Sequence, residues 1–203
     1  MAVIRIDASS ALIIVDVQRD FLPGGALPVP EGDEVIPILN RYIEIFKKMG
    51  GKIFATRDWH PVNHISFRSR GGAWPPHCVQ GTKGAEFSET LRLPEDLIVV
   101  SKATDPDSES YSGFAGTDLA DKLRKHGVKR VFIGGLATEY CVKNTVLDAA
   151  EEGFETYFLE DASKGINLNP GDVERAIEEM LEKGALKIRI SDIKEDFPDR
   201  SGY

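Results

Sequence analysis

Short runs of apolar and β-branched residues recur along the chain and predict six strands. Most of these runs are apolar at consecutive positions, a pattern typical of strands that are buried on both faces of a parallel sheet. The predicted strands cover residues 11–17, 52–56, 97–101, 130–133, 155–159 and 186–190.

Between several of these runs, apolar residues recur at spacings of three and four, which predicts amphipathic helices. The helical patterns cover residues 35–46, 119–123, 141–149 and 173–181, and each is followed by a glycine that stops it. Strands that alternate with helices predict a doubly wound, three-layer α/β/α fold around a mostly parallel six-stranded sheet. Because one hydrophobic core serves up to ~250–300 residues, we expect a single domain over residues 1–203, with a polar tail at 191–203.

Composition narrows the function classes. The chain carries 25 Lys and Arg against 33 Asp and Glu, a net charge of −8, which argues against nucleic acid or an anionic membrane as a partner. Its apolar runs are far shorter than the ~18–20 residues of a membrane span, and no secretory signal pattern is visible. Two cysteines are too few for a disulfide framework, so we expect a cytoplasmic protein.

Four polar residues stand at or near the carboxyl ends of predicted strands. Asp16 interrupts the first strand, Asp58 follows the second, Lys102 follows the third and Cys141 lies shortly after the fourth. In open α/β sheets, ligands bind beyond these ends, where the strand order reverses. In the common order 3-2-1-4-5-6, Asp16 and Cys141 would face each other across that crevice.

Cys141 is the candidate nucleophile. It begins a predicted helix, where free amides and the helix dipole stabilise a thiolate. We expect Lys102 to lower the pKa of the thiol further, and Asp16 to accept its proton. The alternative interpretation is a small buried residue that only packs at a helix start; we adopt that interpretation for Cys78.

A second cluster has the composition of a metal site. Asp58 and His60 point the same way along an extended segment, and His77 returns from the long segment that follows. Two imidazoles and one carboxylate leave coordination positions open for catalysis by Zn, Fe or Mn. His64 is either a fourth ligand or a hydrogen-bond partner of the ligands. In the competing interpretation these histidines only cap turns.

Aromatic residues occur in the predicted loops beyond the strand ends. Phe21, Trp74, Tyr111 and Phe114 are all placed there. A flat aromatic substrate would need walls of this kind, whereas the alternative interpretation of each residue, taken singly, is packing.

These motifs resemble the nicotinamidase (pyrazinamidase/nicotinamidase) group of the isochorismatase-like cysteine hydrolases. The matching segments follow the family's order and span most of the chain. They are residues 16–21, 23–27, 57–61, 64–67, 74–78, 102, 111–114 and 135–141.

The resemblance implies a metal-dependent hydrolase that converts nicotinamide to nicotinate and ammonia in NAD salvage, through a thioester on Cys141. It implies a catalytic triad, an oxyanion hole behind a non-proline cis peptide bond, walls for the substrate ring, and a divalent metal that binds the pyridine nitrogen. For this metal we expect zinc ahead of iron or manganese. By position these sets are Asp16, Lys102 and Cys141 for the triad; the amides of Ala137 and Cys141 for the oxyanion hole; Phe21 and Trp74 for the walls; and Asp58, His60 and His77 for the metal.

Three other functions stay open at this point. The first is a related cysteine hydrolase that acts on another small amide or carbamoyl compound. The second is a non-haem iron oxygenase, which would use the metal cluster but leave the triad unexplained. The third is a binding domain without activity. The sequence leaves pyrazinamide tolerance and the oligomeric state open, a homo-oligomer included.

Overall fold

The computed structural model describes residues 4–194, and its centre is a six-stranded sheet in which all neighbouring strands run parallel. The strand order is β3-β2-β1-β4-β5-β6, as predicted, so the order reverses between β1 and β4. Most of the predicted tail, from residue 195 onward, lies outside the described residues. The strands are β1 (Ser10–Val15), β2 (Lys52–Asp58), β3 (Ile98–Lys102), β4 (Arg130–Leu136), β5 (Glu155–Lys164) and β6 (Leu186–Ile188).

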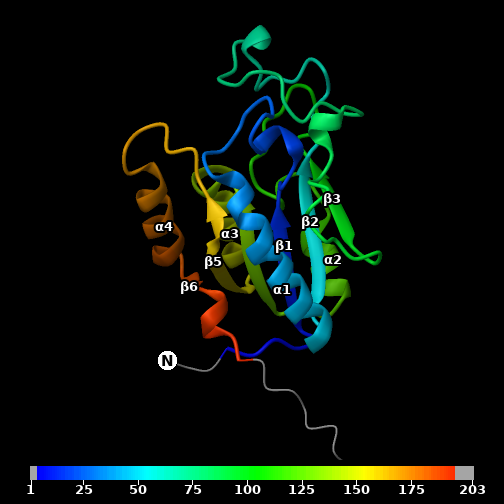
Figure 1. Cartoon of the computed structure of the whole chain (residues 1–203), viewed down its shortest axis with the longest axis vertical. Coiled ribbons are helices and arrows are strands. Elements are labelled where there is room, and N and C mark those ends of the chain that lie inside the picture. The colour runs from blue at the N-terminus through cyan, green and yellow to red at the C-terminus, as the bar shows by residue number, and fades with distance from the viewer. Residues whose placement is uncertain (1–3, 195–203) are drawn as a thin grey trace, which may run out of the picture.

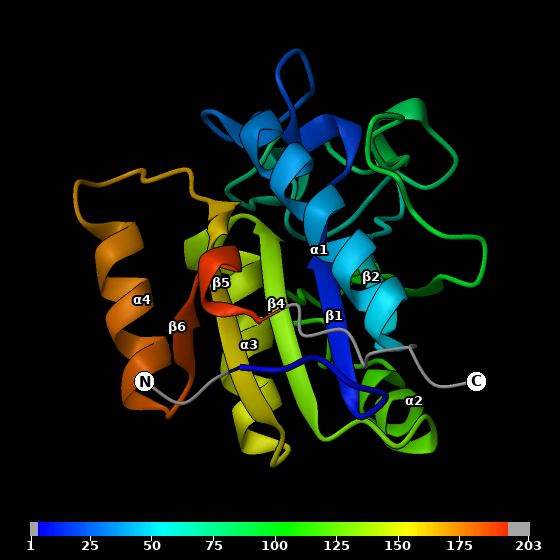
Figure 2. The same cartoon turned by 60° about the horizontal axis from the view of Figure 1, so that its bottom comes forward.

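Helices cover both faces of the sheet and complete the predicted three layers (Figures 1 and 2). One face carries α1, and the other carries α2, α3 and α4. Within the described residues, no helix is long and apolar enough to cross a membrane. The helices are α1 (Val35–Met49), α2 (Leu119–Lys125), α3 (Lys143–Glu151) and α4 (Asp172–Glu182).

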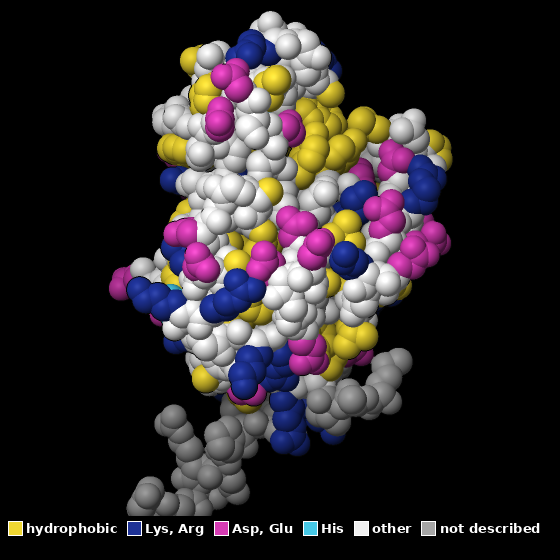
Figure 3. All heavy atoms as spheres, turned by 180° about the vertical axis from the view of Figure 1, so that it is seen from behind, with side chains coloured by type: hydrophobic (Ala, Val, Ile, Leu, Met, Phe, Trp, Pro, Cys, Tyr) yellow, Lys and Arg dark blue, Asp and Glu magenta, His cyan; other side chains and the backbone are white. Residues whose placement is uncertain are grey.

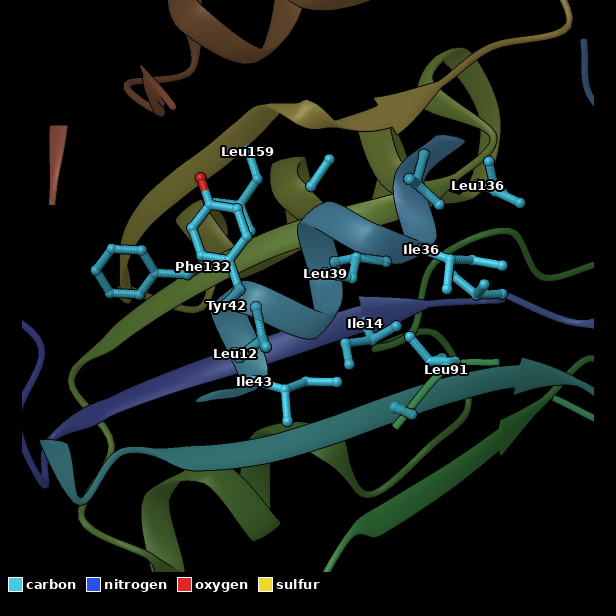
Figure 4. Packing of buried hydrophobic residues seen from close by; sticks show 14 of the residues in the cluster. Leu12, Ile14, Ile36, Leu39, Tyr42, Ile43, Leu91, Phe132, Leu136 and Leu159 are labelled. Carbon is cyan, nitrogen blue, oxygen red and sulfur yellow. The ribbon is translucent and has the colours of Figure 1, made fainter. Parts of the chain in front are cut away.

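The apolar stripe of α1 explains how this layer is held. Tyr42 and Ile43 follow Leu39 by three and four residues, so all three lie on the side of the helix that faces the sheet (Figure 4). They are buried together with Leu12 and Ile14 of β1 in one cluster. Because burying an aliphatic side chain of this size contributes ~1.5–3 kcal/mol, this contact fixes α1 across the central strands.

The first strand ends where the site begins. We expected it to run over 11–17, but Asp16 takes a φ of 50°, which ends the regular strand and turns the chain. Opposite this turn, a Cβ on Gly135 would lie 2.1 Å from the Val15 carbonyl oxygen. Only a glycine therefore allows β1 and β4 to approach this closely at the reversal of strand order.

The fifth strand is longer than the pattern predicted. We expected 155–159, but β5 continues to Lys164. The pairing with β4 shifts register after Ile133 and then resumes, with Gly135 opposite Ser163. The extension carries polar residues, which is why the apolar pattern missed it.

Two long segments follow β2 and β3, and residues 59–97 rise above the arrowheads of the sheet in Figure 1. They contain only short 3₁₀ turns among the described residues. His60 pairs with Val79 in an isolated bridge, so the longer segment folds back on itself. This return brings distant parts of the segment to the carboxyl ends of the strands.

Candidate active site

The four polar residues at the strand ends meet in one buried cluster. Lys102 closes β3 and lies in register with Asp58, the last residue of β2. Its Nζ atom lies 2.5 Å from Asp58 Oδ1, 3.0 Å from Asp16 Oδ2 and 3.3 Å from Cys141 Sγ. All four residues are at most 5% exposed, so one ammonium group joins both carboxylates to the thiol away from water.

The charges in this cluster depend on one another. Burial disfavours a charged lysine, but Asp16 and Asp58 raise the pKa of Lys102 well above its usual value. Burial raises the pKa of Asp16 to about 6, against the opposing effects of Lys102 and of a hydrogen bond from Thr56. For Asp58, burial is outweighed by Lys102 and the neighbouring histidines, and its pKa is lowered. At neutral pH the cluster therefore holds two carboxylates around one ammonium group.

The expectation of a lowered thiol pKa is wrong. Burial raises the pKa of Cys141 well above its usual value, and Lys102 offsets only part of this effect. The residue also lies in a π-helical turn, Thr138–Val142, that precedes α3, rather than in the first turn of that helix. Cys141 is thus a thiol at rest, next to Asp16 as a carboxylate that can accept its proton.

The turn that carries Cys141 is held by hydrogen bonds to a single carbonyl oxygen. The peptide bond between Leu136 and Ala137 is cis, as the resemblance implied. The Tyr140 and Val142 amides both donate to the Ala137 carbonyl oxygen. Among the described residues, the amides of Ala137 and Cys141 are not donors in these hydrogen bonds of the turn.

Asp58, His60 and His77 form a buried group whose ligand atoms all lie within 4.8 Å of one another. His60 Nδ1 is 2.9 Å from the His77 carbonyl oxygen, and His77 Nδ1 is 2.8 Å from that of Pro75. Because a carbonyl oxygen only accepts, each Nδ1 carries the proton and each Nε2 is left as a lone-pair ligand. Burial lowers the pKa of His60 to about 4, which keeps it neutral. One carboxylate and two such imidazoles fit a divalent metal.

His64 lies next to this group but is not part of it. Its ring centroid is 4.3 Å from that of His60. Its Nε2 is 3.1 Å from the Ser108 carbonyl oxygen and its Nδ1 is 2.8 Å from Ser66 Oγ. Both ring nitrogens therefore have protein partners, which favours the hydrogen-bonding role among the alternatives for this residue.

Two residues without a predicted role support the metal group. Gln18 is fully buried, and its amide accepts the Asp58 N–H at 2.7 Å and donates to the Asp58 carbonyl oxygen at 2.8 Å. Phe67, also fully buried, has its ring 5.4–5.8 Å from the rings of the three histidines. Both residues lie in segments that match the family motifs, 16–21 and 64–67, and this was the available signal for them.

A narrow cavity of about 30 Å³ reaches both clusters. Trp74 Nε1 donates to the Tyr111 hydroxyl at 3.1 Å, and the Tyr140 ring stands edge-on to Trp74 at 5.2 Å. Phe114, another of the candidate aromatic residues, does not line this cavity and packs against Phe154 instead. In the view from behind, hydrophobic side chains gather in a recess near the top of the molecule (Figure 3). The cavity is lined by Phe21, Leu27, Asp58, Trp74, His77, Tyr111, Ala137, Tyr140, Cys141 and Ile166.

The comparisons with known proteins agree with this fold. Residues 10–191 match the isochorismatase domain, and the chain belongs to the isochorismatase family. The nicotinamidase of Escherichia coli (strain K12) is 38% identical over 206 residues, which cover 91% of this chain and 97% of that protein.

Solved structures point to the same group within the family. The pyrazinamidase of Pyrococcus horikoshii in complex with zinc is 63% identical, with a TM-score of 0.86, and the match covers 89% of this chain and 99% of that one. PnC1 from L. infantum in complex with nicotinate is 33% identical, with a TM-score of 0.86, covering 95% and 99% of the two chains. The resemblance to nicotinamidases is therefore confirmed.

Proposed function

We propose that this chain is an amidohydrolase that converts nicotinamide to nicotinate and ammonia in NAD salvage. One observation carries the proposal: Lys102 joins the Cys141 thiol and the Asp16 carboxylate to Asp58, a member of the candidate metal group, at one cavity. A nucleophile with its base thus lies next to a group that can hold the substrate. The nicotinamidases among the relatives supply the identity of the amide.

The proposed reaction uses the residues of the thiol cluster in sequence. Asp16 takes the proton of Cys141, and the thiolate attacks the carboxamide carbon to form a tetrahedral intermediate. The amides of Ala137 and Cys141 hold its oxyanion. Protonated Asp16 then gives the proton to the departing ammonia, which leaves a thioester. A water molecule that Asp16 deprotonates hydrolyses the thioester, while Lys102 stabilises the charged forms of both partners.

Asp58, His60 and His77 would hold a divalent metal, and we propose zinc. Bound there, the metal supplies a Lewis acid for the ring nitrogen of the substrate. Phe21 and Trp74 line the same cavity and are proposed to pack against the two faces of the ring.

The remaining expectations belong to the same proposal. The chain would act as a single domain over residues 1–203, in the cytoplasm, with the two free cysteines in keeping with a reducing compartment. A hydrolase for another small amide or carbamoyl compound is the less favoured alternative, because the relatives described above are nicotinamidases or pyrazinamidases.

Chelation tests the metal part of the proposal. We expect the purified protein to release ammonia from nicotinamide, a thorough chelator to stop the release, and added zinc to restore it. An ammonia assay coupled with metal analysis measures both quantities on one sample. Ammonia release that persists after verified metal loss would contradict the role of the metal but keep the cysteine chemistry. No release from a folded, metal-loaded sample would contradict nicotinamide as the substrate.

The pH dependence of kcat/KM should report on Asp16. Burial raises the pKa of this carboxyl from 3.8 to about 6, and only the ionised form can accept the thiol proton. Activity should therefore be full well above this pKa and fall about tenfold per pH unit below it. A profile for nicotinamide on the acid side measures this directly. A limb near the ordinary carboxyl pKa would contradict the raised pKa of Asp16, and an acid-side profile without any limb would contradict its role as the base.

A further inference from the structure

Glu139 is a buried carboxylate that the proposed reaction does not use. It lies in the π-helical turn, two residues before Cys141, and is 8% exposed. Its Oε1 accepts the main-chain N–H of Asn167 at 2.5 Å. Its Oε2 has no hydrogen-bond partner in the part of the chain that the structure describes. Burying a carboxylate with so few partners is costly.

The partner of Glu139 belongs to residues 165–171, the loop that joins β5 to α4. Asn167 has a φ of 55°, and its side-chain oxygen accepts the N–H groups of Asp172 and Val173 at the start of α4. A Cβ on Gly165 would lie 2.5 Å from Glu139 Oε2 and 2.3 Å from Val173 Cγ2. The loop is therefore packed directly on the carboxylate on one side and tied to α4 on the other.

Ile166 stands between the two loop residues that Glu139 meets. Its side chain lines the cavity together with Ala137, Tyr140 and Cys141. Asn167 donates to the Glu139 carboxylate and Gly165 lies directly against it, so the residues on both sides of Ile166 are in contact with Glu139.

We propose that Glu139 is a positioning residue that fixes Ile166 as a wall of the substrate cavity and so limits the size of ring that the enzyme accepts. This inference rests on the proposed function, since it concerns the amide bound at Cys141. Glu139 acts through the loop and touches no reacting atom. Glu139 connects the turn that carries Cys141 to the loop that carries Ile166, so that the nucleophile and this wall of the cavity keep a fixed relative position.

The test compares nicotinamide with a ring-methylated nicotinamide in four variants. We expect Glu139→Ala to raise KM for nicotinamide about tenfold with little change in kcat, and to shift the ratio of kcat/KM toward the methylated amide by about tenfold, the usual effect of one methyl group in a pocket. Ile166→Ala should give the same shift, and the double variant should add nothing further. Leu168→Ala is the matched control, because this loop residue is 60% exposed and should leave the ratio unchanged.

Conservative variants separate positioning from general damage. Glu139→Gln keeps an oxygen that can accept the Asn167 N–H, so it should retain the selectivity of the wild type. If Glu139→Ala is not folded by circular dichroism, Glu139→Asp, one methylene too short to reach Asn167, carries the same expectation.

The results that would overturn the inference are distinct. Unchanged selectivity with an equal loss of kcat on both amides would mean that Glu139 supports only the Cys141 turn. Additive shifts in the double variant would mean that it does not act through Ile166. A wild type that hydrolyses neither amide would instead contradict the proposed function, and this inference with it.

Discussion

Cys141→Ala is expected to reduce ammonia release from nicotinamide by roughly 10⁴-fold or more, the scale of loss when a nucleophile is removed. Without the Sγ atom there is no group to form the thioester, and Asp16 has no thiol proton to accept. Metal content should stay at the wild-type level, because Asp58, His60 and His77 make up the candidate metal group without a sulfur ligand. Steady-state kinetics and metal analysis of the same preparation measure both effects.

Cys78→Ala is the control for this prediction. Cys78 is fully buried in the hydrophobic cluster on the α1 side of the sheet, and burial raises its pKa well above the usual value. We expect this variant to lose some stability while it keeps ammonia release within a few-fold of the wild type. Full activity in Cys141→Ala, or inactivity confined to Cys78→Ala, would show that the wrong cysteine has been assigned.

Lys102→Met should have the second largest effect, on stability and on activity together. The substitution removes the only ammonium group that the structure places within 4.0 Å of Asp16 and Asp58 among the described residues. Breaking a buried ion pair on one side costs ~3–5 kcal/mol, because the remaining charge is left uncompensated. Because two buried carboxylates are left without a counter-ion, we expect a fall in Tm on the order of 10 °C. We also expect a loss of kcat, because the thiolate that forms during the reaction loses its counter-charge.

Lys164→Met offers the matched comparison for the stability part. This lysine also pairs with two carboxylates, Glu31 and Glu34, but all three side chains lie at the surface. Exposed pairs contribute ~0–1 kcal/mol, so its Tm should barely change. Differential scanning calorimetry of both variants measures the contrast. Equal Tm values for the two would contradict the account of the buried charge cluster.

The arrangement of the site could be predicted because it follows from strand order. Asp16, Asp58 and Lys102 interrupt or end apolar runs, and a parallel sheet brings all such ends to one edge. Cys141 was placed by the same rule, one turn after β4. The sequence spacing alone predicted that His60 and His77 lie next to Asp58, because the long segment between the two histidines has to return to the sheet edge.

The parts that could not be predicted depend on packing between distant segments. The thiol pKa was expected to be lowered by the helix start and Lys102, but complete burial has the larger effect, and burial is not visible in the sequence. Ile166 was missed because β5 extends through polar residues before its loop begins. Phe114 does not line the cavity, because the sequence does not show which way a loop side chain turns, and here its ring meets Phe154.

The most direct test of the central claim is to trap the thioester on Cys141 with hydroxylamine during turnover. A stronger nucleophile than water should intercept the acyl group, so nicotinohydroxamate should replace nicotinate as hydroxylamine is raised. Ammonia should meanwhile continue to be released, since it leaves before the thioester is cleaved. Chromatography of the products from wild-type enzyme measures the partition. Continued ammonia release with nicotinate as the sole product would mean that water attacks the amide directly, and would contradict a covalent intermediate on Cys141.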